Sequence, residues 1–426
     1  MKNVFTKTFS NGLRLLVVPE PMATTVTAQV FVGVGSAFET KRQSGLSHFL
    51  EHMCFKGTTR RPSAKVISEE LESLGAISNA FTDYEYTSYF AKGNPTHTDR
   101  YLDILSDTYL HSTFPDAEIQ KEKGVIIEEM NMYEDMPQYK VSDVLLSLMY
   151  GDQPFGRSII GSKESVQALL RPDFLSYKKD FYTAANTVLV LAGKITAHDG
   201  VALAKTYFRS LTKGTRAARK KTNGTQRAPR TSVFSKAIDQ AHVLIGFRSL
   251  PRGHKDMAVA RLIATILGRG MSSRLFQLLR EELGVAYYVS ASQESFLDHG
   301  IFSIAAGIDK QRLTEVVGRI LEECAWLTTE LVSPQELAKA KEFSIGTLTL
   351  ALERSDDIAT FYGTQMVLRQ TIKSPDALIR EIRRVSAHDI KRVAKVIFQK
   401  KKANIALVGP FATRDLPLKL FDRLPL

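Results

Sequence analysis

Two histidines and a glutamate lie within five residues of an otherwise apolar stretch, in the segment HFLEH that runs from His48 to His52. On a helix, side chains four residues apart lie one above the other, so His48 and His52 can bind a single ion together. Imidazole nitrogen is a common zinc ligand, and a catalytic zinc keeps one coordination position open. Glu51 lies beside the second histidine, where a carboxylate can accept a proton from water activated by the ion. The motif therefore indicates hydrolytic zinc chemistry; the alternative is two surface histidines on a helix.

The residues around the motif predict the helix that positions it. The apolar residues of SGLSHFLEHMCF recur at the spacing of a helix face packed on a core; they are Leu46, Phe49, Leu50 and Met53. The two histidines then lie on a different face of the helix. Cys54 follows His52 by two residues and points elsewhere, so a third metal ligand at Cys54 is the weaker alternative. We expect Cys54 and Cys324 to be buried free thiols.

A catalytic zinc needs a third protein ligand, and a second predicted helix offers one. The segment IQKEKGVIIEEMNMYED, residues 119–135, has a helical pattern. Glu122 and Glu129 are seven residues apart and lie on one face of this helix, whereas Glu128 lies off that face. We therefore expect Glu129 to be the third ligand and Glu122 to support the site from outside the ligand set. The alternative for each glutamate is a solvated helix surface.

The chain is long enough for two domains, and its two halves resemble each other. It has 426 residues, of which 44% are hydrophobic, so there is enough apolar material for two cores. Similar strands end the halves, at 186–193 and 404–409, and each half also places a strand before a long helix. We predict an α+β fold of two structurally similar α/β-sandwich domains in tandem, residues 1–212 and 231–426. The second domain has no counterpart of HFLEH.

Residues 213–230 form a basic segment between the halves. The net charge of the chain is +12, and seven of its lysines and arginines fall in this segment, which has no acidic residue. A Gly/Thr/Ala-rich stretch without apolar periodicity is typical of a solvated linker. A basic nucleic-acid-binding protein is the alternative, but it rests on charge alone because the chain has no nucleic-acid-binding motif. We therefore predict a linker and no nucleic-acid partner.

The sequence also bears on the compartment. No run approaches the roughly 18 apolar residues that a membrane helix needs, so we expect no membrane association. The first residues, MKNVFTKTFSNGLRLLVVPEP, lack the apolar segment and cleavage site of a signal peptide. They predict instead two strands around the turn dipeptide Asn11-Gly12. We expect the folded domain to begin near residue 1 and the protein to be cytoplasmic.

The motif and its surroundings resemble the pitrilysin family of zinc metallopeptidases, the inverzincins, whose signature is H-x-x-E-H with a distant glutamate. The resemblance covers almost the whole chain, and length and repeat pattern are most similar to the processing-peptidase branch. Its motifs here are GLSHFLEHMCFKGT, SNAFTDYEYTSYF, VIIEEM and SSRLFQLLREELGVAYYV. The resemblance implies that His48, His52 and Glu129 bind one Zn²⁺ per chain. It also implies that Glu51 is the general base and that Glu122 assists catalysis.

The resemblance further implies how a peptide is held. Residues 78–90 resemble the edge strand with which the family's substrates pair, which puts Asn79, Ala80 and Phe81 in contact with substrate. An exposed edge offers unpaired N–H and C=O groups, so an extended peptide can add as a further strand. The alternative, from the residue pattern alone, is an ordinary interior strand.

Two residues of the second half complete the implied site. Arg280 and Tyr287, in LREELGVAYY, resemble the family's Arg/Tyr pair, which implies that they hold substrate and stabilise the oxyanion. Because one chain carries both motifs, we expect a homodimer in which each pair completes the partner's site across a closed cavity; a heterodimer is the alternative. The expected function is a zinc metalloendopeptidase acting on unstructured peptides. The alternative is a non-catalytic scaffold or partner subunit of a heterodimeric relative.

Overall fold

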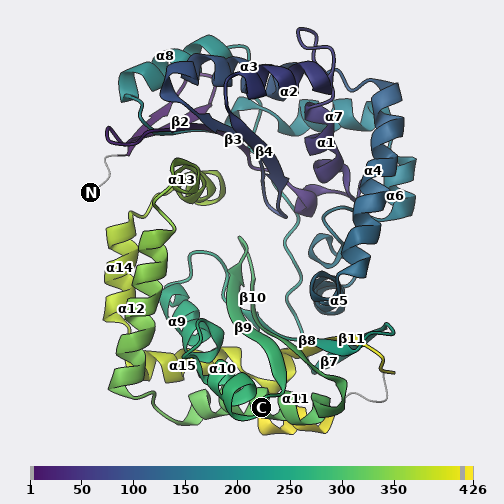
Figure 1. Cartoon of the computed structure of the whole chain (residues 1–426), viewed down its shortest axis with the longest axis vertical. Helices are drawn as coiled ribbons and strands as arrows, with labels where there is room; N and C mark the ends of the chain where they lie inside the picture. Colours follow the sequence, from purple (N-terminus) through teal and green to yellow (C-terminus); the bar gives the residue numbers. More distant parts are fainter. Residues whose placement is uncertain (1–3, 413–417, 426) are drawn as a thin grey trace. The chain divides into compact units, whose positions relative to one another are not determined.

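Each half of the chain forms one mixed β-sheet (Figure 1). The five strands of the second sheet follow the same order as the last five strands of the first. The computed structural model describes residues 4–412 and 418–425. Within these residues the first sheet has six strands in the order β1-β2-β6-β3-β5-β4, and the second has five in the order β7-β11-β8-β10-β9. The pairs β2–β6 and β7–β11 are parallel, and the other neighbouring pairs are antiparallel. The predicted repeat of two similar α+β domains is confirmed.

The strands that form these sheets are mostly apolar. Those of the first sheet are β1 (Phe5–Thr8), β2 (Arg14–Pro19), β3 (Val26–Val32), β4 (Ile77–Thr82), β5 (Thr87–Gly93) and β6 (Thr187–Gly193). Those of the second are β7 (Arg230–Ser235), β8 (Gln240–Ser249), β9 (Ala286–Ser295), β10 (Gly300–Asp309) and β11 (Ala403–Gly409). The interior strands β3 and β6 are buried along their whole length, because side chains on both faces are covered. Each sheet therefore needs helices on both of its faces.

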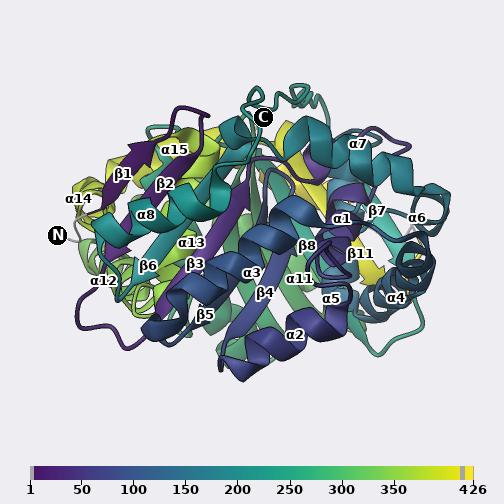
Figure 2. The ribbon, with the colours of Figure 1, turned by 90° about the horizontal axis from the view of Figure 1, so that it is seen from above.

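The first sheet is covered on one face by helices of its own half and on the other by a helix from the second half. The helices of its own half are α1 (Leu46–Cys54), α2 (Ala64–Ser73), α3 (Thr98–His111), α6 (Lys163–Ala168), α7 (Arg171–Phe181) and α8 (Ala197–Phe208). Helices α3 and α8 lie side by side across this sheet (Figure 2). The opposite face packs against α13 (Ser355–Arg369), where Ile358 and Tyr362 meet Phe31 and Val190 in a core of their own.

The second sheet is arranged in the same way. Its own half supplies α9 (Met257–Gly268), α10 (Arg274–Phe276), α11 (Leu313–Thr329), α12 (Pro334–Leu350), α14 (Pro375–Arg384) and α15 (Ala387–Ile397). The other face packs against α5 (Pro137–Tyr150), which follows α4 (Asp116–Asp135) in the first half. Leu145 of α5 lies where a side chain at Gly246 of β8 would stand, so Gly246 leaves room for this helix.

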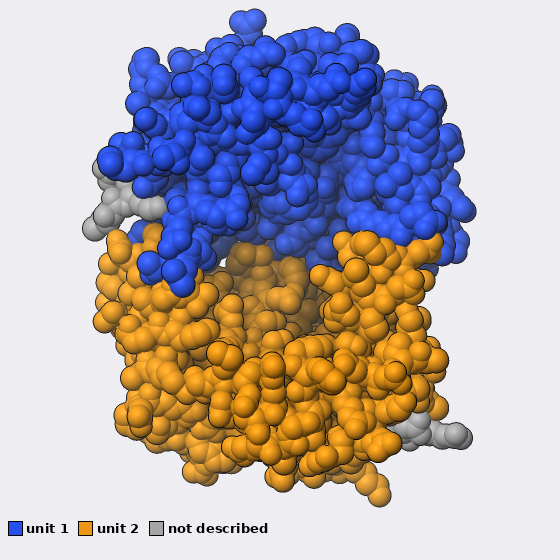
Figure 3. Space-filling model, viewed as in Figure 1, with its two compact units in different colours: residues 1–130, 158–220, 349–374 blue, residues 131–157, 221–348, 375–426 orange. Residues whose placement is uncertain are grey.

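Each half thus donates one helix to the other half's sheet. The chain divides into two units: one comprises residues up to 130, 158–220 and 349–374, and the other comprises 131–157, 221–348 and the residues from 375 onward (Figure 3). The units therefore differ from the continuous domains predicted from the sequence. The physical reason is that both sheets need a second covering layer, and the amphipathic pattern of a helix does not tell which sheet it covers.

The basic segment 213–230 is irregular but is bonded to both units. Arg216 donates to the carbonyl oxygen of Val367 at the end of α13 (2.9 Å), and the Ala217 N–H donates to Asn186 Oδ1 (2.6 Å). Farther along, the Thr222 N–H donates to Asp298 Oδ2 at 2.8 Å. Most residues of the segment are exposed, as expected of a solvated linker, and some of its polar groups also bond to helix ends and loops.

The two cysteines, Cys54 and Cys324, are buried free thiols, as predicted. The thiol of Cys54 donates to the Tyr89 hydroxyl at 3.6 Å, within the core behind α1. None of the helices in the described part of the chain combines the length and hydropathy that a bilayer crossing requires.

Replacing Gly363 with Ala tests the packing of α13 on the first sheet. A Cβ at Gly363 would overlap the buried ring of Phe31. The alanine gains about 0.5–1 kcal/mol of helix propensity, but overpacking a core costs about 1–3 kcal/mol. We therefore expect the free energy of unfolding in urea to fall by about 1–2 kcal/mol. Gly346→Ala in α12, where a Cβ meets no atom within 4 Å, is the control and should be neutral or stabilising; equal losses in both variants would contradict the packing.

Candidate metal centre

Helix α1 carries the HFLEH motif and is fixed at its N-terminal end by a buried carboxylate. Its apolar residues lie in the core, as predicted: Leu46, Phe49, Leu50 and Met53. The side chain of Glu39 accepts hydrogen bonds from the N–H groups of Gly45 (2.8 Å) and Ser47 (2.6 Å). A carboxylate at this place satisfies N–H groups that have no partner within the helix and interacts favourably with the helix dipole. The position of the motif is therefore set by packing and by a cap.

His48, His52 and Glu129 come together as a group of potential metal ligands. Among the described residues they are the one set of three or more His, Cys, Asp or Glu side chains close enough to hold a metal, with ligand atoms within 4.8 Å of one another. Glu129 Oε2 lies 3.6 Å from His48 Nε2 and 3.7 Å from His52 Nε2. These distances are longer than the donor–acceptor distance of a hydrogen bond. They are close to the roughly 3.3–3.5 Å that separates two ligand atoms of a tetrahedral zinc ion whose metal–ligand bonds are about 2.0–2.1 Å long. The structure thus brings together the three predicted ligands.

Glu122 binds the second histidine at Nδ1, the ring nitrogen that does not face Glu129. His52 Nδ1 lies 2.8 Å from Glu122 Oε1, and the other carboxylate oxygen lies 2.6 Å from Lys56 Nζ. A hydrogen bond donated by Nδ1–H fixes the tautomer whose Nε2 lone pair faces Glu129. Lys56 was not predicted; its position one helical turn after His52 is the signal that could have indicated it.

The electrostatics of this cluster favour a cation. Burial lowers the pKa of His48 to about 3, with a further contribution from the neighbouring His52, so the His48 imidazole is neutral, as a metal ligand must be. Burial also acts to lower the pKa of His52, but its hydrogen bond to Glu122 and the charges of the nearby glutamates outweigh burial and raise it. Carboxylates that favour a proton on His52 equally favour a metal cation there. The two imidazoles and one carboxylate therefore fit zinc.

Glu51 lies in α1 between the two histidines and is held by strand β4. Its Oε2 accepts a 2.5 Å hydrogen bond from Thr82 Oγ1 at the end of that strand. Burial raises the pKa of Glu51 to about 7, although the Thr82 hydrogen bond and the charge of His52 act to lower it. A carboxyl group with a pKa near neutrality can accept a proton and return it. Thr82 was not predicted, and no sequence spacing signals a contact between a helix and a distant strand end.

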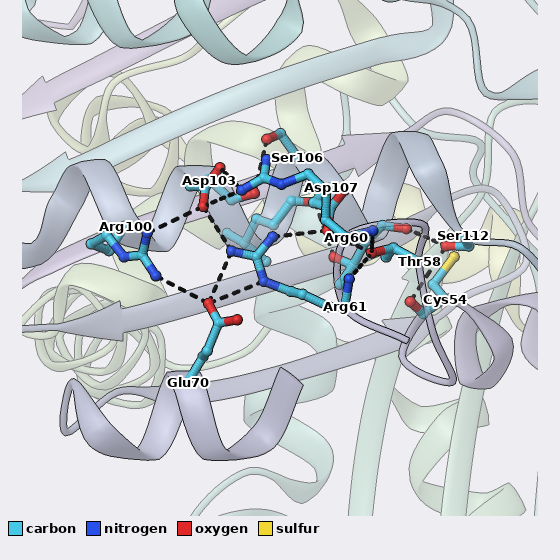
Figure 4. Close-up of polar contacts among 12 residues, drawn as sticks. Cys54, Thr58, Arg60, Arg61, Glu70, Arg100, Asp103, Ser106, Asp107 and Ser112 are labelled. Carbon is cyan, nitrogen blue, oxygen red and sulfur yellow. Dashed lines mark hydrogen bonds and ion pairs between the residues drawn. The ribbon is translucent and has the colours of Figure 1, made fainter. Parts of the chain in front are cut away.

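A buried arginine fixes the segment that follows α1 (Figure 4). The Arg61 side chain is 3% exposed, and its guanidinium donates at 2.7–3.1 Å to three carboxylates, those of Glu70, Asp103 and Asp107. Thr58 Oγ1 also donates to Asp107 at 2.6 Å. These contacts fasten the segment after α1 to α2 and α3, so the chain is fixed by polar contacts at both ends of α1.

Replacing Arg61 with Met should destabilise the protein, because it leaves the fully buried carboxylate of Asp107 without its positively charged partner, with only the Thr58 hydroxyl, among the described residues, still donating to it. Breaking a buried ion pair costs about 3–5 kcal/mol, and we expect about 3 kcal/mol from urea unfolding at pH 7. Arg100→Met is the control: Arg100 also binds Glu70, but it is half exposed, so we expect a loss of at most about 1 kcal/mol.

The effect of Arg61→Met should also depend on pH. Burial acts to raise the pKa of Asp103, but hydrogen bonds from Arg60 and Arg61 outweigh burial and lower it. A lowered pKa contributes stability above the unfolded value of about 3.9, and that contribution is lost as the pH falls through the folded value. The difference in urea midpoint between wild type and variant should therefore narrow in acid. A difference that stays constant between neutral pH and acid would contradict this assignment.

The predicted substrate strand lies at the edge of the first sheet. Strand β4 ends the strand order and pairs with β5 on one side, which decides against the interior-strand alternative. Asn79 is exposed, and Ala80 and Phe81 are half-buried. The Ala80 N–H donates to Asn79 Oδ1 at 2.8 Å, and the Phe81 ring packs edge-on against Tyr86. The edge is thus present, and its contact with a peptide stays a prediction.

Arg280 and Tyr287 lie in the other unit. Arg280 is exposed in a π-helical turn, residues 277–282, and its guanidinium carbon lies 5.0 Å from the centroid of the Phe276 ring. Tyr287 is 69% exposed on β9, which is the edge strand of the second sheet. The role of this pair at the metal centre stays a prediction.

Comparisons with known proteins agree with this geometry. Residues 14–163 match the family model described as Insulinase (Peptidase family M16), and residues 169–343 match the model described as Peptidase M16 inactive domain. Over 408 residues the chain is 34% identical to a Bacillus subtilis protein named "Uncharacterized zinc protease YmxG", which covers 95% of this chain and 97% of the relative. The chain belongs to peptidase family M16. The resemblance to the pitrilysin family is thereby confirmed.

Solved structures of other proteins have the same fold. A protease from Helicobacter pylori superimposes with a TM-score of 0.89 at 23% identity, covering 96% of this chain and 100% of the other. A chain of Complex III2 from Candida albicans superimposes with a TM-score of 0.87 at 17% identity and full coverage of both chains. At these identities the likeness shows the fold alone, and this fold is shared by a protease and by a chain of Complex III2.

Proposed function

We propose that this M16 chain is a zinc-dependent endopeptidase that hydrolyses peptide bonds of unstructured peptides. The observation that carries the proposal is the convergence of His48 Nε2 and His52 Nε2 on Glu129 Oε2, at 3.6 and 3.7 Å, with Glu51 in the same helix as both histidines. These three residues would hold one Zn²⁺ per chain. Bound zinc supplies a Lewis acid that polarises the peptide carbonyl and lowers the pKa of water.

The chain's own residues would then move the proton and hold the geometry. Glu51 accepts a proton from the attacking water and delivers it to the leaving amine. Thr82 keeps the Glu51 carboxylate in one orientation through its 2.5 Å hydrogen bond. Glu122 keeps His52 in the tautomer that offers Nε2 to the ion.

Substrate would bind to the first sheet as an added strand. The edge of β4, with Asn79, Ala80 and Phe81, offers main-chain groups to any extended peptide, so folded proteins are poor substrates. Arg280 and Tyr287 are suitable donors for charge that develops on the scissile carbonyl. We propose that they reach the site from the other subunit of a cytoplasmic homodimer that encloses the substrate.

The first experiment is a metal analysis joined to a peptide assay. Purified protein should contain about one zinc per chain and cleave a quenched fluorogenic peptide, and a chelator should remove the activity, which added zinc restores. Native mass measured on the same sample tests the homodimer. Zinc-loaded protein without hydrolysis of a peptide library would contradict the proposal.

A non-catalytic partner subunit is the second candidate function. The observation that favours it is that residues 169–343 match a model described as inactive and that the fold occurs in a chain of Complex III2. The intact HFLEH, the third ligand and the Thr82-bound Glu51 favour the peptidase instead. A stable complex with a different chain, combined with the absence of peptide hydrolysis, would decide for the partner subunit.

A further inference from the structure

The loop between β4 and β5, residues 83–86, connects the proposed substrate edge to the proposed general base. Thr82, immediately before it, donates to Glu51, and residues 79–81 precede Thr82 on the edge strand. The loop is closed by a 2.8 Å hydrogen bond from the Asp83 N–H to the Tyr86 carbonyl oxygen. Any movement of this loop therefore displaces both the substrate edge and the partner of Glu51.

One side of the loop rests on the segment before α1. The N–H groups of Ser36 and Ala37 donate to the carbonyl oxygens of Asp83 (3.3 Å) and Tyr84 (2.8 Å). A Cβ at Gly35 would overlap the Asp83 carbonyl oxygen, so the two backbones are in direct contact. These contacts fix the loop from its main chain.

The other side is held by an arginine of the linker. Arg219 Nη2 donates to Glu85 Oε1 at 2.9 Å, and both side chains are buried, with 6% of Arg219 and 1% of Glu85 exposed. A charge pair removed from water in this way is screened little by salt, and loss of one partner leaves the other charge buried. Glu85 is the acidic residue at the tip of the loop, and its buried partner comes from a segment far along the chain.

The linker also contacts this unit at points away from the loop. Arg216 binds the end of α13, and the Ala217 N–H donates to Asn186 Oδ1. Arg219 is thus the last linker residue whose side chain packs into the first unit, because residues from 221 onward belong to the second unit. One positive charge of the linker, that of Arg219, is therefore used inside the protein.

We propose that Arg219 is a positioning residue of the peptidase site: through Glu85 it holds the β4–β5 loop, and through that loop the substrate edge and Thr82. This inference rests on the proposed peptidase function. Arg219 touches no reacting atom, so its loss changes how accurately the substrate strand and Glu51 are placed, while the metal ligands stay intact.

The test compares Arg219→Ala with Arg216→Ala, a second linker arginine that binds the same unit away from the loop. In Arg219→Ala, kcat/KM for a quenched peptide should fall about tenfold or more, with zinc per chain unchanged. Amide hydrogen exchange in residues 77–87 should speed up about tenfold. Arg216→Ala should keep kcat/KM within about twofold and leave exchange in residues 77–87 unchanged. Arg219→Lys, which keeps the charge, should recover part of the loss.

The double variant Arg219→Met with Glu85→Gln covers the case in which Arg219→Ala does not fold, because it buries no unpaired charge. It should show the same loss of kcat/KM and the same faster exchange at a wild-type Tm. Wild-type kcat/KM and exchange in either variant, or an equal loss in Arg216→Ala, would overturn the inference. If wild-type protein cleaves no peptide, the proposed function fails; the exchange comparison then still decides whether Arg219 holds the strand.

Discussion

Replacing Glu51 with Gln should lower kcat for peptide hydrolysis by about 10³-fold or more while leaving about one zinc per chain. The amide has the shape of the carboxylate and can still accept the Thr82 hydrogen bond, so the local structure should persist. It cannot accept a proton near pH 7, so the proton of the attacking water has no acceptor. The measurement is steady-state hydrolysis of a quenched peptide with zinc determined on the same preparation.

The matched control is Thr82→Val, which removes the hydrogen bond to Glu51 and keeps the carboxylate. It should lose much less activity than Glu51→Gln, about tenfold, because the base is present but less firmly oriented. Turnover by Glu51→Gln at the wild-type rate would exclude Glu51 as the base. Loss of zinc together with activity would instead make Glu51 a residue that maintains the metal site.

Replacing Glu129 with Gln should release zinc. An uncharged amide oxygen is a poorer zinc ligand than a carboxylate, and the two histidines alone leave an incomplete site. We expect zinc affinity to fall by more than about 100-fold, beyond the 10–100-fold typical of outer partners. Competition with a chromophoric chelator measures this affinity directly and requires no activity.

Two other glutamates of α4 make this experiment specific. Glu128→Gln changes the exposed neighbour of Glu129 and should leave zinc affinity unchanged. Glu122→Gln weakens the partner of His52 Nδ1 and should lower affinity by about 10–100-fold. Zinc affinity should therefore be highest in Glu128→Gln, lower in Glu122→Gln and lowest in Glu129→Gln. Equal affinity in wild type and Glu129→Gln would move the third ligand elsewhere.

The ligand set could be predicted because helical spacing determines which side chains share a face. His48 with His52, and Glu122 with Glu129, are placed by the period of the helix, and the apolar stripe of α1 shows which face is inward. The repeat of two sheets was visible for the same reason, since strand and helix patterns recur in both halves. Local periodicity therefore accounts for what the sequence revealed.

Contacts between distant elements could not be predicted where no motif or helical spacing indicates them. Thr82 meets Glu51 because a strand ends beside a helix, and Arg219 meets Glu85 because an irregular linker follows the first unit. The exchange of α5 and α13 leaves no local trace either, because an amphipathic helix satisfies its apolar face on any sheet of suitable shape. Which helix covers which sheet, and which side chains meet there, depends on the packing of the whole chain.

The exchange of α5 and α13 has a consequence for biosynthesis. The first sheet keeps one apolar face bare, with Leu16, Phe31 and Val190, until α13 has been synthesised near residue 369. A nascent chain that already contains the candidate metal ligands is therefore still unable to finish folding the unit that carries them. An incomplete chain that ends at the linker would expose this apolar surface and tend to aggregate. Helix α13, late in the chain, is thus needed before the unit that carries the candidate metal centre can fold stably.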